Sequence, residues 1–122
     1  MLEVSVVLLG LTVLCGAALV LVSLAAPGKP PSRLLATSHG VGAFFGYGLL
    51  LLALRGPARG VATGTQSFGI TAAVFLLLAA ALGVASLMVH RRQRRLPGFW
   101  AGAHATIAIT GYVILAVYLL LG

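Results

Sequence analysis

The sequence predicts an all-α integral membrane protein whose four transmembrane helices form an up-down bundle made of two tandem helical hairpins. Hydrophobic residues make up 61% of the 122 residues and charged residues only 7%, whereas a soluble domain carries about 25% charged residues. The chain also contains four long uncharged stretches, and each is close to the roughly 20 residues that a helix needs to cross a bilayer. Finally, the second and fourth stretches share a sequence pattern, which predicts a repeated hairpin.

The four helices are expected at residues 4–26, 34–54, 68–89 and 99–121. The first stretch begins beside an acid, Glu3, and is longer than the apolar core of a secretory signal peptide, so we expect it to be retained as a helix. The connections are too short to fold separately, so residues 1–122 should form one transmembrane domain. The lone cysteine, Cys15, excludes an internal disulfide. We expect it near mid-membrane as a small apolar filler, away from the level of the histidines.

The basic residues predict the orientation in the membrane. The chain carries eight Lys and Arg against one acid, a net charge of +7, and every base lies in a connection: Lys29, Arg33, Arg55, Arg59, Arg91, Arg92, Arg94 and Arg95. By the positive-inside rule, connections 27–33 and 90–98 are cytoplasmic and both termini are outside, as in a bacterial inner membrane protein. Bases in such short gaps indicate topology rather than a nucleic-acid partner. For the cluster from Arg91 to Arg95, anionic lipid or the acidic surface of a partner is the alternative to simple anchoring.

An internal repeat relates the second helix to the fourth. A shift of 65 positions aligns the two helices in the pattern A-x2-H-x3-A-x2-G-Y-x2-L-x3-L. The shared positions fall at the three- and four-residue steps of one helix face. The pattern therefore predicts a tandem repeat of residues 1–55 and 66–122, related by a pseudo-two-fold axis along the membrane normal.

The repeat contains two intramembrane histidines, His39 and His104, each five residues inside the cytoplasmic end of its helix. An ionisable residue in a membrane span indicates function by default. No span holds an acid, so the ring nitrogens must find a backbone carbonyl, a hydroxyl, each other or a metal. Two neutral imidazoles facing each other suit the axial positions of a haem iron. Small residues on the same faces would leave room for the macrocycle: Ala36, Ala43, Gly46, Ala101, Ala108 and Gly111.

Paired histidines on two helices, with glycine or alanine one and two turns away, resemble the small membrane b-type cytochromes. The resemblance is one of architecture and covers the second and fourth helices. It implies that His39 and His104 are the axial ligands of a haem b, in a protein that passes electrons between quinones and redox partners. Tyr47 and Tyr112 could then bond a quinone or line the haem pocket; alternatively, each hydroxyl bonds a neighbouring backbone group.

We therefore expect a haem b-binding electron-transfer protein, or the cytochrome subunit of a quinone-linked or respiratory complex, rather than a self-contained enzyme. Its partners would be the lipid bilayer and either other membrane subunits or a second copy. One alternative is a cofactor-free accessory subunit in which the histidines join helices and glycines such as Gly42 and Gly46 serve close packing. Another is a metal-handling protein whose histidines bind copper or zinc. We expect His90 mainly as an interfacial residue near a helix C-terminus, and the alternative is that it completes a three-histidine metal site with His39 and His104.

Overall fold

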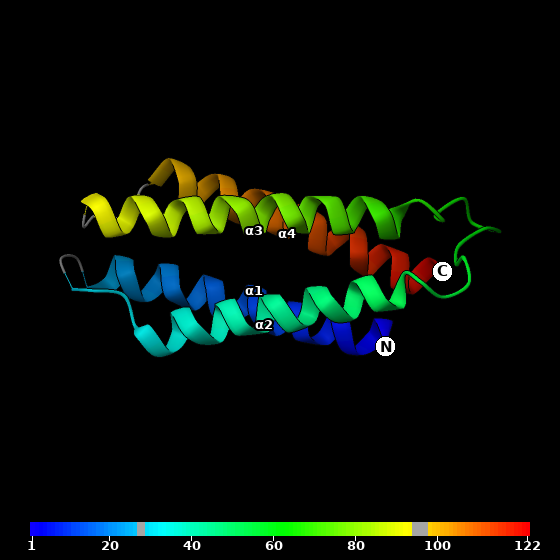
Figure 1. The fold of residues 1–122 in the computed structure, drawn as a ribbon, viewed down its shortest axis with the longest axis horizontal. Coiled ribbons are helices and arrows are strands. Elements are labelled where there is room, and N and C mark those ends of the chain that lie inside the picture. The colour runs from blue at the N-terminus through cyan, green and yellow to red at the C-terminus, as the bar shows by residue number, and fades with distance from the viewer. Residues whose placement is uncertain (27–28, 94–97) are drawn as a thin grey trace. The chain divides into compact units, whose positions relative to one another are not determined.

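The structure is a computed structural model that describes residues 1–26, 29–93 and 98–122. Over these residues the chain forms four helices: α1 (Leu2–Ala25), α2 (Arg33–Ala53), α3 (Phe68–Gln93) and α4 (Gly98–Leu121) (Figure 1). All four are long and apolar enough to cross a membrane. The prediction of an all-α protein with four membrane-length helices is confirmed.

The chain divides into two compact units, Met1–Arg55 and Gly56–Gly122. In the first unit α1 packs against α2, and in the second α3 packs against α4. Each pair runs antiparallel, as Figure 1 shows by the colour order along the chain. Each unit is therefore one helical hairpin, and the short turn of each hairpin includes residues outside the described part, 27–28 in the first and 94–97 in the second.

Local sequence explains where the helices begin and end. Pro30 and Pro31 precede α2, and the hydroxyl of Ser32 accepts a hydrogen bond from the amide of Leu35 at 3.4 Å, which caps the first turn. Gly56 and Pro57 follow α2 and cannot continue a helix well.

The third helix is longer than the sequence predicted, because it continues past Val89 to Gln93. This extension holds His90, Arg91 and Arg92 in the last turn. Cations near a helix C-terminus are favoured by the partial negative charge of its carbonyls. No proline lies between Phe68 and Leu96, so the helix can continue beyond the end of the apolar span.

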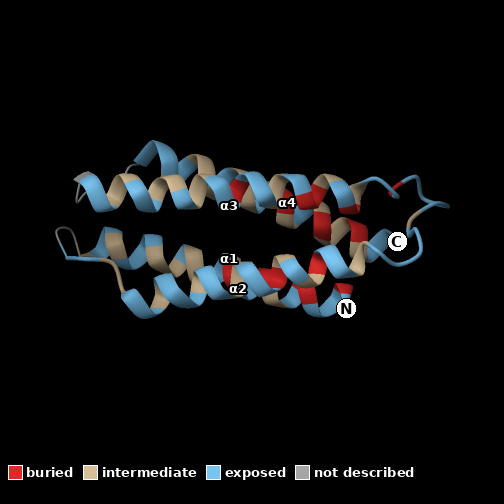
Figure 2. Ribbon diagram, in the orientation of Figure 1, coloured by how far each residue is buried: buried red, intermediate tan, exposed pale blue. Residues whose placement is uncertain are grey.

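Buried residues concentrate in the half of each hairpin that lies away from its short turn (Figure 2). Leu50 of α2 and Leu115 of α4 are fully buried, and these two leucines occupy equivalent places in the sequence repeat. The other half of each hairpin, next to the turn, is mostly half-buried or exposed. His39 and His104 lie in this less-buried half, and both are half-buried.

The loop before α3 is tied to the end of α4 in the same unit. Gly60 and Gly64 have φ angles of 73° and 72°, which glycine adopts at little steric cost. The hydroxyl of Thr63 lies 3.0 Å from the carbonyl oxygen of Leu121, to which it can donate. This contact gives one of the last carbonyls of α4 a partner outside its own helix.

Candidate functional site

The first histidine lies on the face of α2 that packs against α1. The Nδ1 atom of His39 is 2.9 Å from the carbonyl oxygen of Thr12. The ring lies against Gly16, one turn along α1 from Thr12: a methyl group added at Gly16 would be 2.9 Å from Cε1 of His39. Because real side chains do not approach this closely, the ring needs a glycine at this position.

The second histidine has the same surroundings in the other hairpin. The Nδ1 atom of His104 in α4 is 2.7 Å from the carbonyl oxygen of Ala79 in α3. A methyl group added at Gly83 would lie 3.1 Å from both Cε1 and Nδ1 of His104. We call each set of histidine, carbonyl acceptor and glycine a histidine niche: Thr12, Gly16 and His39 form the first, and Ala79, Gly83 and His104 form the second.

The two niches extend the repeat to α1 and α3. Thr12 and Ala79 are 67 positions apart, and so are Gly16 and Gly83, whereas the histidines are 65 apart. The shift differs by two because Gly16 and His39 are 23 positions apart, whereas Gly83 and His104 are 21 apart. The helices α1 and α3 thus present a carbonyl and a glycine to their histidine at equivalent places.

The hydrogen bond in each niche fixes the tautomer of a neutral ring. A carbonyl oxygen can only accept, so Nδ1 carries the proton and donates it to Thr12 in one niche and to Ala79 in the other. The lone pair of the neutral ring is then on Nε2. A histidine that binds a metal through one nitrogen commonly donates from the other to a carbonyl or carboxylate. Both niches therefore hold the imidazole in the form that ligates iron, copper or zinc through Nε2.

The small residues predicted to leave room for a cofactor have two different surroundings. Gly46 is buried against Leu9, since a methyl group there would lie 2.8 Å from the leucine side chain, and Gly111 is buried in the same way against Phe75 and Leu76. These glycines allow close packing inside each hairpin. Ala43 and Ala108, one turn from the histidines, are half-buried. Gly42 likewise faces Thr12 of α1.

Tyr47 and Tyr112 are both half-buried. Each follows the buried glycine of its helix, Gly46 or Gly111, and so lies in the more tightly packed half of its hairpin. Within residues 1–26, 29–93 and 98–122, neither phenolic hydroxyl makes a hydrogen bond. A role for either tyrosine toward a quinone or a haem edge remains a prediction.

Cys15 lies nearer to the level of His39 than the sequence indicated. Its thiol is 3.3 Å from the carbonyl oxygen of Leu35, one turn before His39 in α2, and the adjacent Gly16 touches the histidine ring. The pairing of α1 with α2 sets this depth. The expectation that Cys15 is too far from the histidines to ligate the same ion stays a prediction.

The third histidine, His90, is half-buried in the last turn of α3. Across the described part of the chain, no group of three or more His, Cys, Asp or Glu side chains is placed to hold a metal ion. The three-histidine metal site considered from the sequence therefore has no support within those residues.

Sequence reasoning missed the carbonyl acceptors of the niches. Every residue has a carbonyl, so no residue type marks Thr12 or Ala79, and only the register between paired helices selects them.

No protein-family model, curated protein or solved structure matches this chain. The functional argument therefore rests on the residues of the chain itself.

Proposed function

We propose that the chain is a membrane electron-transfer protein that binds one haem b, with His39 and His104 as the axial ligands. The observation that carries this proposal is the pair of equivalent histidine niches. Two helices of different sequence, α1 and α3, each supply a glycine at the ring and a carbonyl at Nδ1. A duplicated histidine setting of this kind is expected where two identical ligands serve one metal centre.

The residues of each niche fit an axial ligand in chemistry as well as in placement. Donation from Nδ1 raises the basicity of the ring and fixes its orientation, as the partners of metal-bound histidines do. The glycine lets the ring sit close to the neighbouring helix, which limits its rotation. Both rings lie in the less-buried half of their hairpin, where Ala43 and Ala108 take up little space. The haem would supply reversible one-electron transfer; the protein would supply ligation, orientation and exclusion of water.

The proposal requires each hairpin to supply one of the two histidines that would hold the haem. It predicts that loss of either histidine abolishes low-spin haem, since one remaining ligand cannot produce the spectrum of two.

The decisive experiment is a visible spectrum of the chain purified in mild detergent, before and after reduction with dithionite. We expect a sharp α band in the reduced protein, its loss in His39→Ala and in His104→Ala, and its retention in His90→Ala. The last variant is the matched control, because His90 lies outside both niches. Added imidazole should restore part of the band in the two ligand variants, since the truncation leaves space beside Gly16 or Gly83.

Two results would contradict the proposal. One is a well-folded, colourless protein that does not take up added haem. The other is a band that is lost in His90→Ala and kept in His39→Ala or His104→Ala.

A cofactor-free accessory subunit of a larger membrane complex is the second candidate, and the niche hydrogen bonds favour it too. Each bond joins two helices of a hairpin, and such bonds stabilise membrane proteins by about 0.6 kcal/mol on average. In this case the purified protein is colourless, and His39→Ala lowers its stability without a spectral change. Metal analysis of the same colourless sample tests the third possibility, that the histidines handle copper or zinc.

We also propose that the chain lies in a bacterial inner membrane with both termini outside and connections 27–33 and 90–98 in the cytoplasm. Six bases in these two connections against two in the remaining one support this orientation.

A further inference from the structure

We infer that the end of the α3–α4 hairpin binds the headgroup of an anionic phospholipid through Arg91 and Arg92, with Phe99 and Trp100 seated beside it. We call these four residues the headgroup surface. The inference is independent of any haem, because it rests on charge and exposure at the end of a single hairpin.

Charge balance favours the binding of an external anion. The unit Gly56–Gly122 contains no Asp or Glu, and the one acid of the whole chain, Glu3, is in the first turn of α1 in the other unit. Arg91 and Arg92 are both exposed in the last turn of α3. Carbonyls at the helix C-terminus offset part of this charge, but a guanidinium has five donors arranged to bind a phosphate or carboxylate in two places. The phosphate of a lipid headgroup is the anion that a membrane surface offers at the end of a spanning helix.

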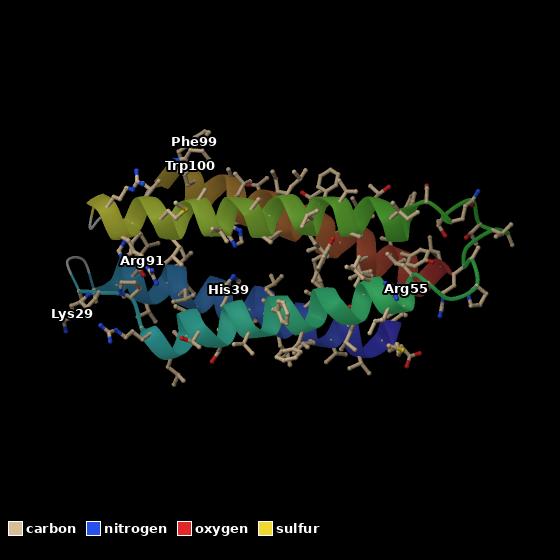
Figure 3. All side chains as sticks on the ribbon, in the orientation of Figure 1. Lys29, His39, Arg55, Arg91, Phe99 and Trp100 are labelled. Atoms are coloured by element: carbon tan, nitrogen blue, oxygen red, sulfur yellow. The ribbon has the colours of Figure 1, made fainter. Side chains whose placement is uncertain are left out.

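The aromatic residues show why the anion should belong to a lipid. Phe99 is 78% exposed and Trp100 is 36% exposed, in the first turn of α4, and their rings meet edge to face with centroids 5.6 Å apart. Arg91, Phe99 and Trp100 lie at the same end of this hairpin (Figure 3). Exposed aromatic rings at a span end belong at the level of the headgroups. A phospholipid offers both a phosphate for the arginines and an acyl boundary for the rings, whereas a free phosphate ion offers nothing to the rings.

The chain supplies a matched control at the other membrane face. Arg55 and Arg59 are also exposed, and they carry the same charge as Arg91 and Arg92. The sequence from Arg55 to Arg59 contains no aromatic residue. If charge alone attracted anionic lipid, the two pairs would bind it equally.

The test uses the full chain, delipidated in mild detergent and titrated with phosphatidylglycerol or phosphatidylcholine while native mass spectrometry counts the bound lipids. We expect saturable binding of phosphatidylglycerol and little of phosphatidylcholine. The variant R91Q/R92Q should lower the affinity for phosphatidylglycerol about 25-fold, taking roughly fivefold for each arginine near a headgroup. R55Q/R59Q should lower it less than threefold.

Further measurements identify the source of the phosphate and show whether the variants fold. Millimolar inorganic phosphate should not displace the lipid, and F99A/W100A should weaken lipid binding with all the charges retained. R91K/R92K keeps the charge and loses the forked donors, so it should fold as the wild type does and bind with intermediate affinity. Equal binding of the two lipids, an equal loss in R55Q/R59Q, or displacement by inorganic phosphate would each overturn the inference.

Discussion

Two glycines define the candidate site as much as the two histidines do. Gly16 and Gly83 have no side chain, and this absence leaves the space in which an imidazole packs against the helix. The sequence identified the histidines because an ionisable group in a membrane span stands out. It did not identify the carbonyls of Thr12 and Ala79 that fix the ring nitrogens, because a backbone acceptor is present at every position.

Substitution of Gly16 by alanine tests the first niche. The added methyl group would lie 2.9 Å from Cε1 of His39, so the ring or α1 must move. Overpacking of this kind costs about 1–3 kcal/mol. We expect Gly16→Ala to lower the free energy of unfolding in detergent by that amount and, if haem is bound, to shift the α band.

Gly40→Ala is the matched control, because nothing lies within 4 Å of a methyl group at Gly40, next to His39 in the chain. Its stability should equal that of the wild type or exceed it by up to about 1 kcal/mol, because alanine favours a helix more than glycine does. Gly83→Ala should cost less than Gly16→Ala, since its closest approach is 3.1 Å. Equal effects of Gly16→Ala and Gly40→Ala would show that the ring does not pack as described.

At the scale of the elements, composition explains the helices and single residues explain their ends. Long apolar runs form α1 to α4, and proline or glycine lies in or next to the connections. The one clear extension beyond the apolar span is in α3, where cationic residues continue the helix to Gln93. Hydrophobicity predicts only the part of a helix that lies inside the bilayer. The last turn of α3 is charged, so hydrophobicity does not predict it, although it is helical.

The loop before α3 allows a graded test of backbone strain. Gly64 has a φ of 72° and open space around it, so Gly64→Ala should cost about 1–2 kcal/mol through the left-handed conformation alone. A methyl group at Gly60, whose φ is 73°, would in addition meet the hydroxyl of Thr65 and lie 3.1 Å from its carbonyl carbon.

We therefore expect Gly60→Ala to destabilise the protein more than Gly64→Ala, and to expose Arg55 and Arg59 to faster cleavage by trypsin. Unfolding in detergent and limited proteolysis provide the measurements. A Gly60→Ala variant with the stability of Gly64→Ala would mean that Thr65 does not pack on this turn.

At the scale of the whole molecule, the distribution of charge matters more than its total. The net charge of +7 arises from bases at the ends of helices and in the connections. The proposal of outside termini rests on the six bases in two of the connections. The proposal of lipid binding rests on the arginines at the end of the α3–α4 hairpin, whose unit contains no Asp or Glu.

Topology reporters test this orientation. A reporter fused after Gly122 should be active outside, and one inserted within residues 27–33 should be active in the cytoplasm. Replacing the four arginines from Arg91 to Arg95 by glutamine leaves two bases on each side, so the reporter at Gly122 should then give a mixed signal. A cytoplasmic signal after Gly122 in the unaltered chain would contradict the proposed orientation.

The sequence by itself determined the membrane class, the number of helices and the repeat of His39 and His104, because hydrophobic length and residue identity are local properties of the chain. Only the tertiary structure decided that each imidazole lies between the two helices of its own hairpin, with Nδ1 on a carbonyl and its edge on a glycine. It also brought Cys15 close to the level of His39. The physical reason is the register between paired helices. The close approach of Gly46 and Gly111 to side chains of the facing helix sets this register, so the sequence of one helix alone does not determine it.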